Sequence, residues 1–267
     1  MNVYFLDRHP VKVAEFYVDR HVLTMIAEIG WILSSAHRLL DGKLQKQVMA
    51  PAIYRNLCTM GWTGRVDQTA LLLPGESLVF KAEMFEKVSD ISGWSIQDSR
   101  AVPIIGERGF LIDHLHPCTH WVCERVQNYA WLSELFKALY DEKIFRFPDS
   151  HDDTMDLYGE FLSKVPVHLV DNSGFTDPPI LMPASYKVDD PVESYRRYYI
   201  GDKYHFAKWT RRSIPRWYLE SLAEVWAFDP DTRIKKISDP KIAKKTQITL
   251  KHVKKYLPHV YKRLVIC

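Results

Sequence analysis

The residues best suited to acid and base chemistry lie in an otherwise apolar stretch near the N-terminus. His21, Thr24 and Glu28 are separated by three and four residues, a spacing that places them on one face of a helix. An ionisable group in an apolar helix costs free energy unless it is hydrogen-bonded, and such placements often mark working sites. The sequence therefore predicts His21 and Glu28 as an acid–base pair. The alternative is a hydrogen-bonded core histidine and a glutamate that reaches a neighbouring arginine.

A second group of reactive residues lies in the centre of the chain, and its members are His114, His116, Cys118, His120 and Cys123. Histidine and cysteine side chains are metal ligands. Pro117 and the helical pattern after it would scatter these side chains around a helix, so we assign no metal ligands. A metal-dependent enzyme is kept as one alternative. We predict His116 and His120 as further acid or base groups.

A third segment, ESYRRYYIGDKYHFAKWTRRSIPRWY, interleaves basic and aromatic residues at high density. Basic groups neutralise phosphates and aromatic faces stack on bases, so this mixture is typical of a nucleic-acid or nucleotide surface. Arg196, Lys203 and Arg212 are the predicted phosphate contacts. The full predicted binding set is Tyr195, Arg196, Tyr199, Lys203, Lys208 and Arg212. Because so aromatic a helix must bury one face, some of its rings are expected to pack in the core.

The C-terminal part of the chain is strongly basic. Residues 233–263 contain many lysines and a single acidic residue, Asp239, although the net charge of the whole chain is only +3. A solvated helix face explains such a composition. A non-specific, salt-sensitive contact with nucleic acid explains it equally well, because a polarised charge distribution steers a polyanion toward one end of a molecule.

The elements that position these residues are expected to be mainly helical. Hydrophobic periodicity predicts long helices over residues 11–40 and 117–145, apolar on most sides and therefore buried, and shorter ones over 192–209 and 215–228. The predicted fold class is mainly α, a helical core around two long buried helices. A short strand at residues 2–6 and a mixed α/β insertion at 43–113 complete it. We expect a principal domain at 1–232 and a basic C-terminal element at 233–267.

Several broad classes of protein are excluded by what the sequence lacks. It contains no phosphate-binding GxxxxGK[ST], GxGxxG, GxSxG or HExxH motif. It has no apolar run of about 18 residues and no basic-then-apolar leader, so we expect no membrane partner. The four cysteines form no CxxC pair, which indicates reduced thiols and a cytoplasmic location. The sequence assigns no cofactor.

Three segments together resemble a conserved family of tailed bacteriophages and large DNA viruses whose activity is not assigned. They are VYFLDRHPVKVAEFYVDRHVLTMIAEIGWILSSAHR, HPCTHWVCERVQNYAWLSELFKALYDE, and MPASYKVDDPVESYRRYYIGDKYHFAKW with its trailing IPRWY. The resemblance covers most of the chain apart from the insertion and the tail. It implies a viral protein that works in an infected host cell.

In helical layout the chain also resembles the pyrimidine-dimer DNA glycosylases, which pair an N-terminal helical segment with a helix that begins at His-Pro. In that family the terminal amine is the nucleophile and a glutamate assists, so the likeness implies the terminal amine and Glu28 here. The chain departs from the family because bulky Asn2 is expected to keep Met1 in place. Likeness of layout carries no function by itself.

The sequence thus predicts a viral nucleic-acid-directed protein with DNA favoured over RNA, and with a nucleotide as another ligand. The first hypothesis is an enzyme acting on a DNA base or modified nucleotide, through glycosylase-like or base-modification chemistry. Its acid and base groups would be His21, Glu28, His116 and His120. The alternative is a non-catalytic DNA- or RNA-binding accessory protein, in which the buried polar residues only order the core.

Overall fold

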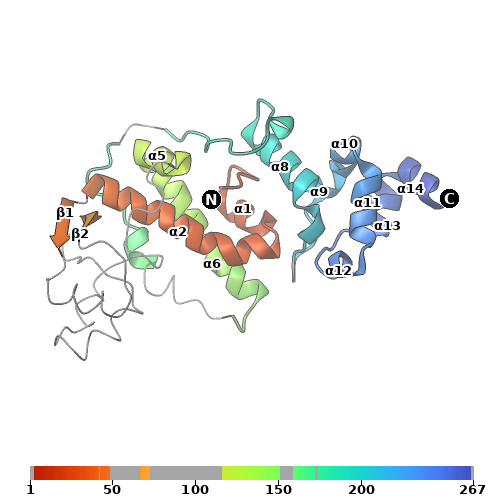
Figure 1. Cartoon of the computed structure of the whole chain (residues 1–267), viewed down its shortest axis with the longest axis horizontal. Helices are drawn as coiled ribbons and strands as arrows, with labels where there is room; N and C mark the ends of the chain where they lie inside the picture. The colour runs from red at the N-terminus through yellow and green to blue at the C-terminus, as the bar shows by residue number, and fades with distance from the viewer. Residues whose placement is uncertain are drawn as a thin grey trace. The chain divides into compact units, whose positions relative to one another are not determined.

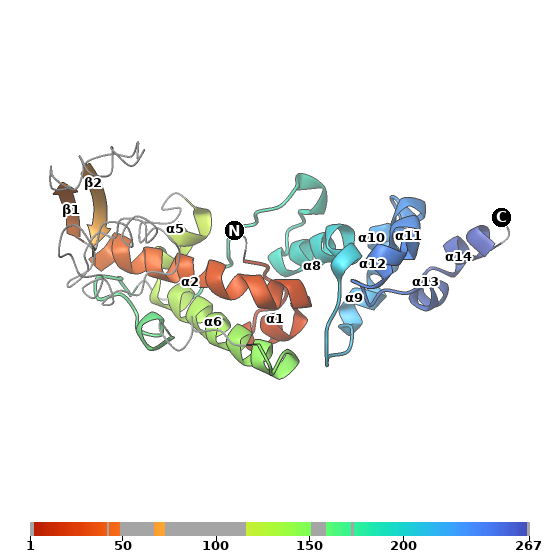
Figure 2. The same ribbon diagram turned by 60° about the horizontal axis from the view of Figure 1, so that its bottom comes forward.

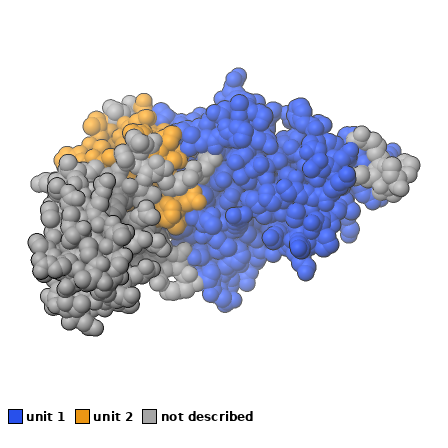
Figure 3. All heavy atoms as spheres, in the orientation of Figure 1, with its two compact units in different colours: residues 1–26, 134–152, 176–267 blue, residues 27–133, 153–175 orange. Residues whose placement is uncertain are grey.

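The computed structural model describes residues 3–41, 43–48, 67–72, 116–150, 159–171 and 174–265. The chain divides into two compact units, which Figure 3 colours separately. Unit 1 consists of residues 1–26, 134–152 and 176–267, and unit 2 of residues 27–133 and 153–175. The described residues are mainly helical, as predicted. None of the helices among them is both long enough and apolar enough to cross a membrane.

Unit 1 begins with a buried segment that is not a strand. Val3, Phe5 and Leu6 are fully buried, yet residues 3–6 form no strand, contrary to the prediction for residues 2–6. The backbone groups that a neighbouring strand would pair are satisfied elsewhere. The Tyr4 amide donates to the Tyr17 hydroxyl at 3.0 Å, and the Leu6 carbonyl accepts from Arg196 Nε at 2.9 Å. Side chains therefore replace a sheet partner for this segment.

The predicted helix over residues 11–40 is two helices, α1 (Pro10–Phe16) and α2 (Asp19–Asp41). Tyr17 between them has an extended backbone. The buried Arg146 guanidinium donates to the carbonyl oxygens of Glu15 and Tyr17 at 2.9 and 2.8 Å. The last carbonyls of a helix have no partner within it, so these bonds stabilise the end of α1 at this point.

The predicted helix over residues 117–145 is also interrupted once. The structure has α5 (Pro117–Glu124) and α6 (Val126–Arg146), separated by Arg125 in an extended conformation. The buried amide of Asn128 donates to the carbonyl oxygen of Trp121 at 2.9 Å and satisfies the end of α5. In each long segment a side chain donates to carbonyl oxygens at the break, and it is the distant Arg146 at the first break and the nearby Asn128 at the second.

The basic and aromatic segment of unit 1 begins as predicted and ends early. Helix α8 (Pro191–Asp202) follows Asp190, whose carboxylate accepts from the Val192 amide at 3.1 Å. A short 3-10 turn, η3 (Tyr204–Phe206), comes next, and residues 207–209 are not helical. Helices α9 (Arg216–Glu220) and α10 (Leu222–Trp226) lie beside the end of α8 (Figure 1).

The basic C-terminal part folds into four short helices of unit 1. They are α11 (Pro230–Ser238), α12 (Pro240–Ala243), α13 (Leu250–Tyr256) and α14 (Pro258–Val265), and Figure 2 shows them together with α9 and α10. Thr246 Oγ1 donates to the Tyr204 carbonyl at 2.9 Å, and Gln247 Oε1 accepts from the Trp209 amide at 2.7 Å. The C-terminal helices are thereby bonded to the segment that follows α8.

Unit 2 contains α5, parts of α2 and α6, and a two-stranded sheet. Strands β1 (Lys43–Val48) and β2 (Asp67–Leu72) pair antiparallel, with Lys43 opposite Leu72 and Val48 opposite Asp67. Both strands fall in the predicted insertion at 43–113. The remainder of that insertion lies outside the described residues, so its mixed character stays a prediction. The same holds for the domain boundary at residue 232, which no observation tests.

Candidate nucleic-acid interface

His21 lies in an aromatic cluster in the core of unit 1. Its ring stacks on Tyr4, with 4.4 Å between ring centroids and 10° between planes, and meets the Phe206 ring edge-on. Nδ1 is hydrogen-bonded to the hydroxyl of Tyr199, a fully buried residue of α8. This geometry is that of a histidine packed and hydrogen-bonded within a core.

The surroundings of His21 hold it in the neutral form. Burial, together with the positive charges of Lys203 and Arg20, lowers the pKa of His21 from its ordinary value of 6.5 to about 3. A general base works best when its pKa lies near the working pH, which is not the case here. The role of His21 as a base stays a prediction, and the described geometry favours the structural alternative.

The other three predicted acid–base residues belong to unit 2. Glu28 is half-buried on α2. His116 is the N-cap of α5, where its Nδ1 accepts from the Cys118 amide at 3.1 Å, and His120 on α5 is exposed. The N-cap explains the sequence position of His116 directly before Pro117. Because His21 belongs to unit 1, the structure describes no single site that contains all four residues.

The cysteines and histidines around α5 point in different directions, as the helical interpretation predicted. Cys118 is buried, Cys123 is half-buried and His120 is exposed. Within the described ranges no three His, Cys, Asp or Glu side chains form a group that could hold a metal ion. His114, the first member of the predicted cluster, lies outside the described residues.

Two of the six predicted nucleic-acid contacts have no exposed surface on which a base could stack. Tyr195 and Tyr199 of α8 are both fully buried. The Tyr195 hydroxyl donates to the Pro179 carbonyl at 2.8 Å, and the Tyr199 hydroxyl is bonded to His21. Their aromatic faces pack inside unit 1, which is the core role that the sequence could not assign to individual rings.

Most of the predicted cationic contacts also have partners within unit 1. Arg196 donates to the Leu6 carbonyl and lies over the Trp217 ring, with 4.9 Å to its centroid. Arg212 donates to both carboxylate oxygens of Glu142, at 3.0 and 2.8 Å. Lys203 donates to Asp202 at 2.6 Å. Lys208 is the exposed member of the set. These arginines are held by intramolecular bonds that a phosphate would have to replace.

A different surface of unit 1 presents cations without such bonds. All lysines between residues 233 and 263 are exposed, and we call them the lysine surface: Lys235, Lys236, Lys241, Lys244, Lys245, Lys251, Lys254, Lys255 and Lys262. Most of the large apolar residues between them point inward, since Ile237, Val253 and Leu257 are almost or fully buried, whereas Leu250 is 45% exposed. The helices therefore separate an apolar core from a basic exterior.

The single acid among these residues has a structural role. The carboxylate of Asp239 caps α12 and accepts from the Lys241 amide at 2.7 Å. From residue 240 to the end the sequence contains no aspartate or glutamate. Because this segment supplies no acidic side chain to pair with its lysines, its surface attracts anions.

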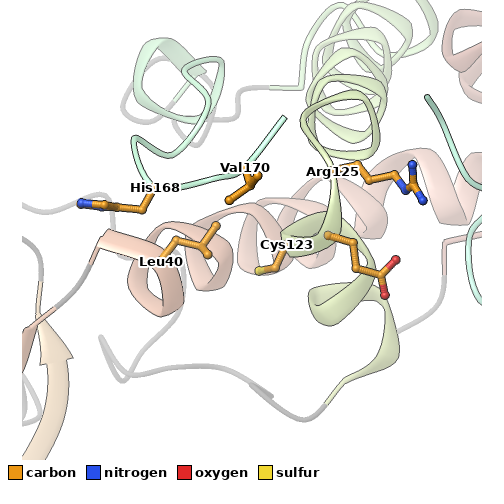
Figure 4. A pocket seen from close by; sticks show the side chains of 6 residues that line it. Leu40, Cys123, Arg125, His168 and Val170 are labelled. Atoms are coloured by element: carbon orange, nitrogen blue, oxygen red, sulfur yellow. The ribbon is translucent and has the colours of Figure 1, made fainter. Parts of the chain in front are cut away.

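A pocket of unit 2 offers a second place for a ligand. It has a volume of about 390 Å³ and is lined by Leu40, Cys123, Glu124, Arg125, His168 and Val170. Figure 4 shows Leu40, Cys123 and Val170 pointing toward one another, whereas Arg125 points away. Burial and the charge of Glu124 raise the pKa of the Cys123 thiol to about 11, so it stays protonated at neutral pH. A protonated thiol is a poor nucleophile.

His168 at the edge of this pocket is bonded to the end of α2. The Asp41 carboxylate accepts from His168 Nδ1 at 2.8 Å and from the Val167 and His168 amides at 3.0 Å. These hydrogen bonds with His168 and Val167 outweigh the effect of burial and lower the pKa of Asp41. The three bonds hold residues 167–168 against α2. Sequence inspection missed this pair because its members are separated by 127 residues.

The lysine surface was visible in the sequence as a charge bias, but its exposure was not. Lysines at partly helical spacing fit either a solvated tail or a folded element, and only the burial of the apolar residues between them distinguishes the two. The aromatic density of residues 193–218 is the stronger sequence pattern, yet it reflects core packing for the most part.

Comparison of the chain with protein-family models, with curated proteins and with solved structures gives no match.

Proposed function

We propose that the protein binds nucleic acid through the lysine surface of helices α11 to α14. The observation that carries the proposal is the exposure of every lysine at residues 233–262, in a segment whose apolar residues Ile234, Ile237, Ile248, Val253, Leu257 and Val260 are buried. Lysines that neutralise phosphates release condensed counterions, which supplies a favourable and salt-dependent free energy of binding. DNA is the expected ligand, in line with the resemblance to a family of DNA viruses.

A basic surface could also attract an anionic membrane, but the burial pattern favours nucleic acid. Interfacial membrane helices place apolar side chains in the lipid. Here Val253, Leu257 and Val260 are buried in the protein and are not free to insert, and the 45% exposed Leu250 does not by itself form an apolar face. Binding of phosphates needs only the exposed charges, which the lysine surface supplies.

The non-catalytic alternative is favoured over the base-directed enzyme by the surroundings of His21. This residue is nearly inaccessible, hydrogen-bonded to Tyr199 and neutral at physiological pH. A catalytic group must reach its substrate. A catalytic role for Glu28, His116 or His120 stays a prediction that no geometry in the described residues supports.

The test compares two charge-matched variants in a fluorescence anisotropy assay with labelled DNA over a range of salt concentrations. Lys241, Lys244 and Lys245 are replaced by Gln in the first variant, and the exposed Lys12, Lys137 and Lys187 in the second. We expect the first variant to weaken binding and to lower the slope of log K against log salt by about 2–3, because three phosphate contacts are lost. The second variant should bind as the wild type does.

Two results would contradict the proposal. One is the absence of DNA binding by the wild type at low salt, and the other is an equal loss of affinity in both variants. Equal loss would mean that net charge alone, and no particular surface, determines binding. Binding of the wild type to vesicles that contain anionic lipid is measured as well. Tighter binding to the vesicles than to DNA would indicate that the partner of the lysine surface is a membrane.

A further inference from the structure

The lysine surface contains two aromatic side chains that lie beside its cations. Tyr256 ends α13 and Tyr261 lies on α14, and both are partly exposed. Lys255 Nζ lies 5.1 Å from the ring centroid of Tyr256, and Lys254 Nζ lies 5.7 Å from that of Tyr261. The second contact joins α13 to α14. Two rings with adjacent ammonium groups therefore occupy one part of the basic surface.

The same part of the chain lacks negative charge. Both tyrosines fall in the segment after residue 240, which contains no aspartate or glutamate. Arg216 of unit 1 lies near enough to interact electrostatically with Tyr256, although its guanidinium is paired with the Glu220 carboxylate at 2.6 Å. A phosphate next to either ring would therefore meet cations and no carboxylate of this segment.

The two tyrosines of the predicted binding set and the most exposed phenylalanine of the described residues in unit 1 do not combine these properties. Tyr195 and Tyr199 are fully buried. Phe228 is 92% exposed, but two exposed aspartates, Asp229 and Asp231, lie within the next three residues. These carboxylates would repel a phosphate backbone that brought a base to the Phe228 ring. Phe228 therefore serves as a control: its ring is exposed, but acidic residues follow it in sequence.

We propose that the lysine surface takes single-stranded nucleic acid, with bases stacked on Tyr256 and Tyr261 and the flanking phosphates held by Lys254 and Lys255. This inference rests on the proposed function and adds the class of ligand to it. Bases in a duplex already stack on one another, whereas unpaired bases can stack on an exposed ring. A single strand therefore gains ring contacts that a duplex cannot make, while both gain from the lysines.

The first experiment measures affinity for an oligothymidylate strand and for a duplex of the same length. Tyr256 and Tyr261 are replaced together by Leu in one variant and by Phe in another. We expect the Leu variant to lose about fivefold or more in single-strand affinity, because stacking is lost, with duplex affinity and salt slope unchanged. The Phe variant keeps both rings and should bind as the wild type does. Phe228→Leu is the matched control and should change neither affinity.

A second measurement needs no variant and guards against a Leu variant that folds poorly. Irradiation of the wild type with a single strand that carries 5-iodouracil links the base to a ring stacked on it. Peptide mapping by mass spectrometry should place the cross-link at Tyr256 or Tyr261. Cross-links confined to other residues would overturn the inference.

The outcomes separate this inference from the proposed function. If the wild type binds neither strand nor duplex at low salt, the proposed function itself fails. The wild type could instead bind with the expected salt dependence while the Leu variant keeps full single-strand affinity, or while the wild type prefers the duplex. In either case the proposal that the lysine surface binds nucleic acid is retained. The role of the two tyrosines is then refuted.

Discussion

At the scale of single residues, the clearest outcome concerns His21. Spacing along the helix predicted a polar pair, and both a catalytic and a structural role were compatible with it. The structure gives His21 a stacking partner in Tyr4 and a hydrogen-bonding partner in Tyr199, which is 178 residues away in sequence. No pattern in one sequence reveals a partner so distant. This is why the residue could be identified as unusual but its role could not be assigned.

A pair of variants distinguishes the two roles of the polar residues on α2. His21→Ala removes a buried ring and leaves the Tyr199 hydroxyl without its partner, so we expect a loss of about 2–4 kcal/mol in the free energy of unfolding. Glu28→Gln, at a half-buried position, should change this free energy by no more than about 0.5 kcal/mol. Chemical denaturation of both variants beside the wild type measures the difference. An unchanged stability of His21→Ala would contradict the core role.

The pH dependence of stability gives a second readout for His21. Its pKa falls from 6.5 in the unfolded chain to about 3 in the folded protein, so only the unfolded state binds the proton between these values. The stabilisation is complete above about pH 6.5 and is lost as the pH falls toward 3. Between about pH 7.5 and about pH 5, the wild type should therefore lose more stability than His21→Phe, which has no titrating ring. Equal losses would mean that His21 does not titrate abnormally.

At the scale of elements, the sequence predicted which segments are helical and where several of the helices begin, but it did not predict where the long helices end. Asp190 and Pro191 start α8, and Pro117 starts α5, as capping preferences predict. The break near Tyr17 depends on the distant Arg146, and the break near Arg125 depends on a polar contact of Asn128 that periodicity does not record. Periodicity continues through both breaks because the apolar faces on either side are buried in the same way. Tertiary hydrogen bonds determined where each helix ends.

The guanidinium of Arg146 has the largest share in these tertiary bonds. It is fully buried and donates to Glu142 at 2.6 Å, to Asp19 at 3.0 Å and to two carbonyls at the end of α1. One residue of α6 thereby holds α1 and the start of α2. Hydrogen bonds with Arg212 and Arg146 outweigh the effect of burial and lower the pKa of Glu142, as expected for a carboxylate between two guanidinium groups.

Replacing Arg146 by Met should therefore be strongly destabilising. The variant leaves Glu142 and the α1 carbonyls with fewer partners in a buried site, and we expect a loss of about 3–5 kcal/mol in the free energy of unfolding. Lys137→Met is the matched control on the same helix, because the Lys137–Asp141 pair is exposed and contributes little. Urea denaturation of both variants measures the two effects. Equal stabilities of the two variants would show that the buried ion pairs do not hold these helices.

At the scale of the whole molecule, the mainly helical fold could be predicted and the place of the candidate interface could be predicted only in part. Composition and periodicity indicate helices, because these depend on local sequence. The densest mixture of basic and aromatic residues, at 193–218, contributes buried Tyr195 and Tyr199 to the core of unit 1. The plainer lysine-rich segment supplies the exposed charge. Burial depends on what each residue meets in the fold, and the sequence pattern carries no direct information about it.

The central claim is that nucleic acid binds to α11–α14 and not to α8. Chemical-shift mapping of backbone amides tests it most directly, with ¹⁵N-labelled protein titrated with an oligothymidylate strand. We predict that the perturbed amides lie within residues 233–262, with the largest shifts in α13 and α14, and that added salt reverses them. Shifts concentrated in residues 195–212, or no shifts at low salt, would contradict the claim.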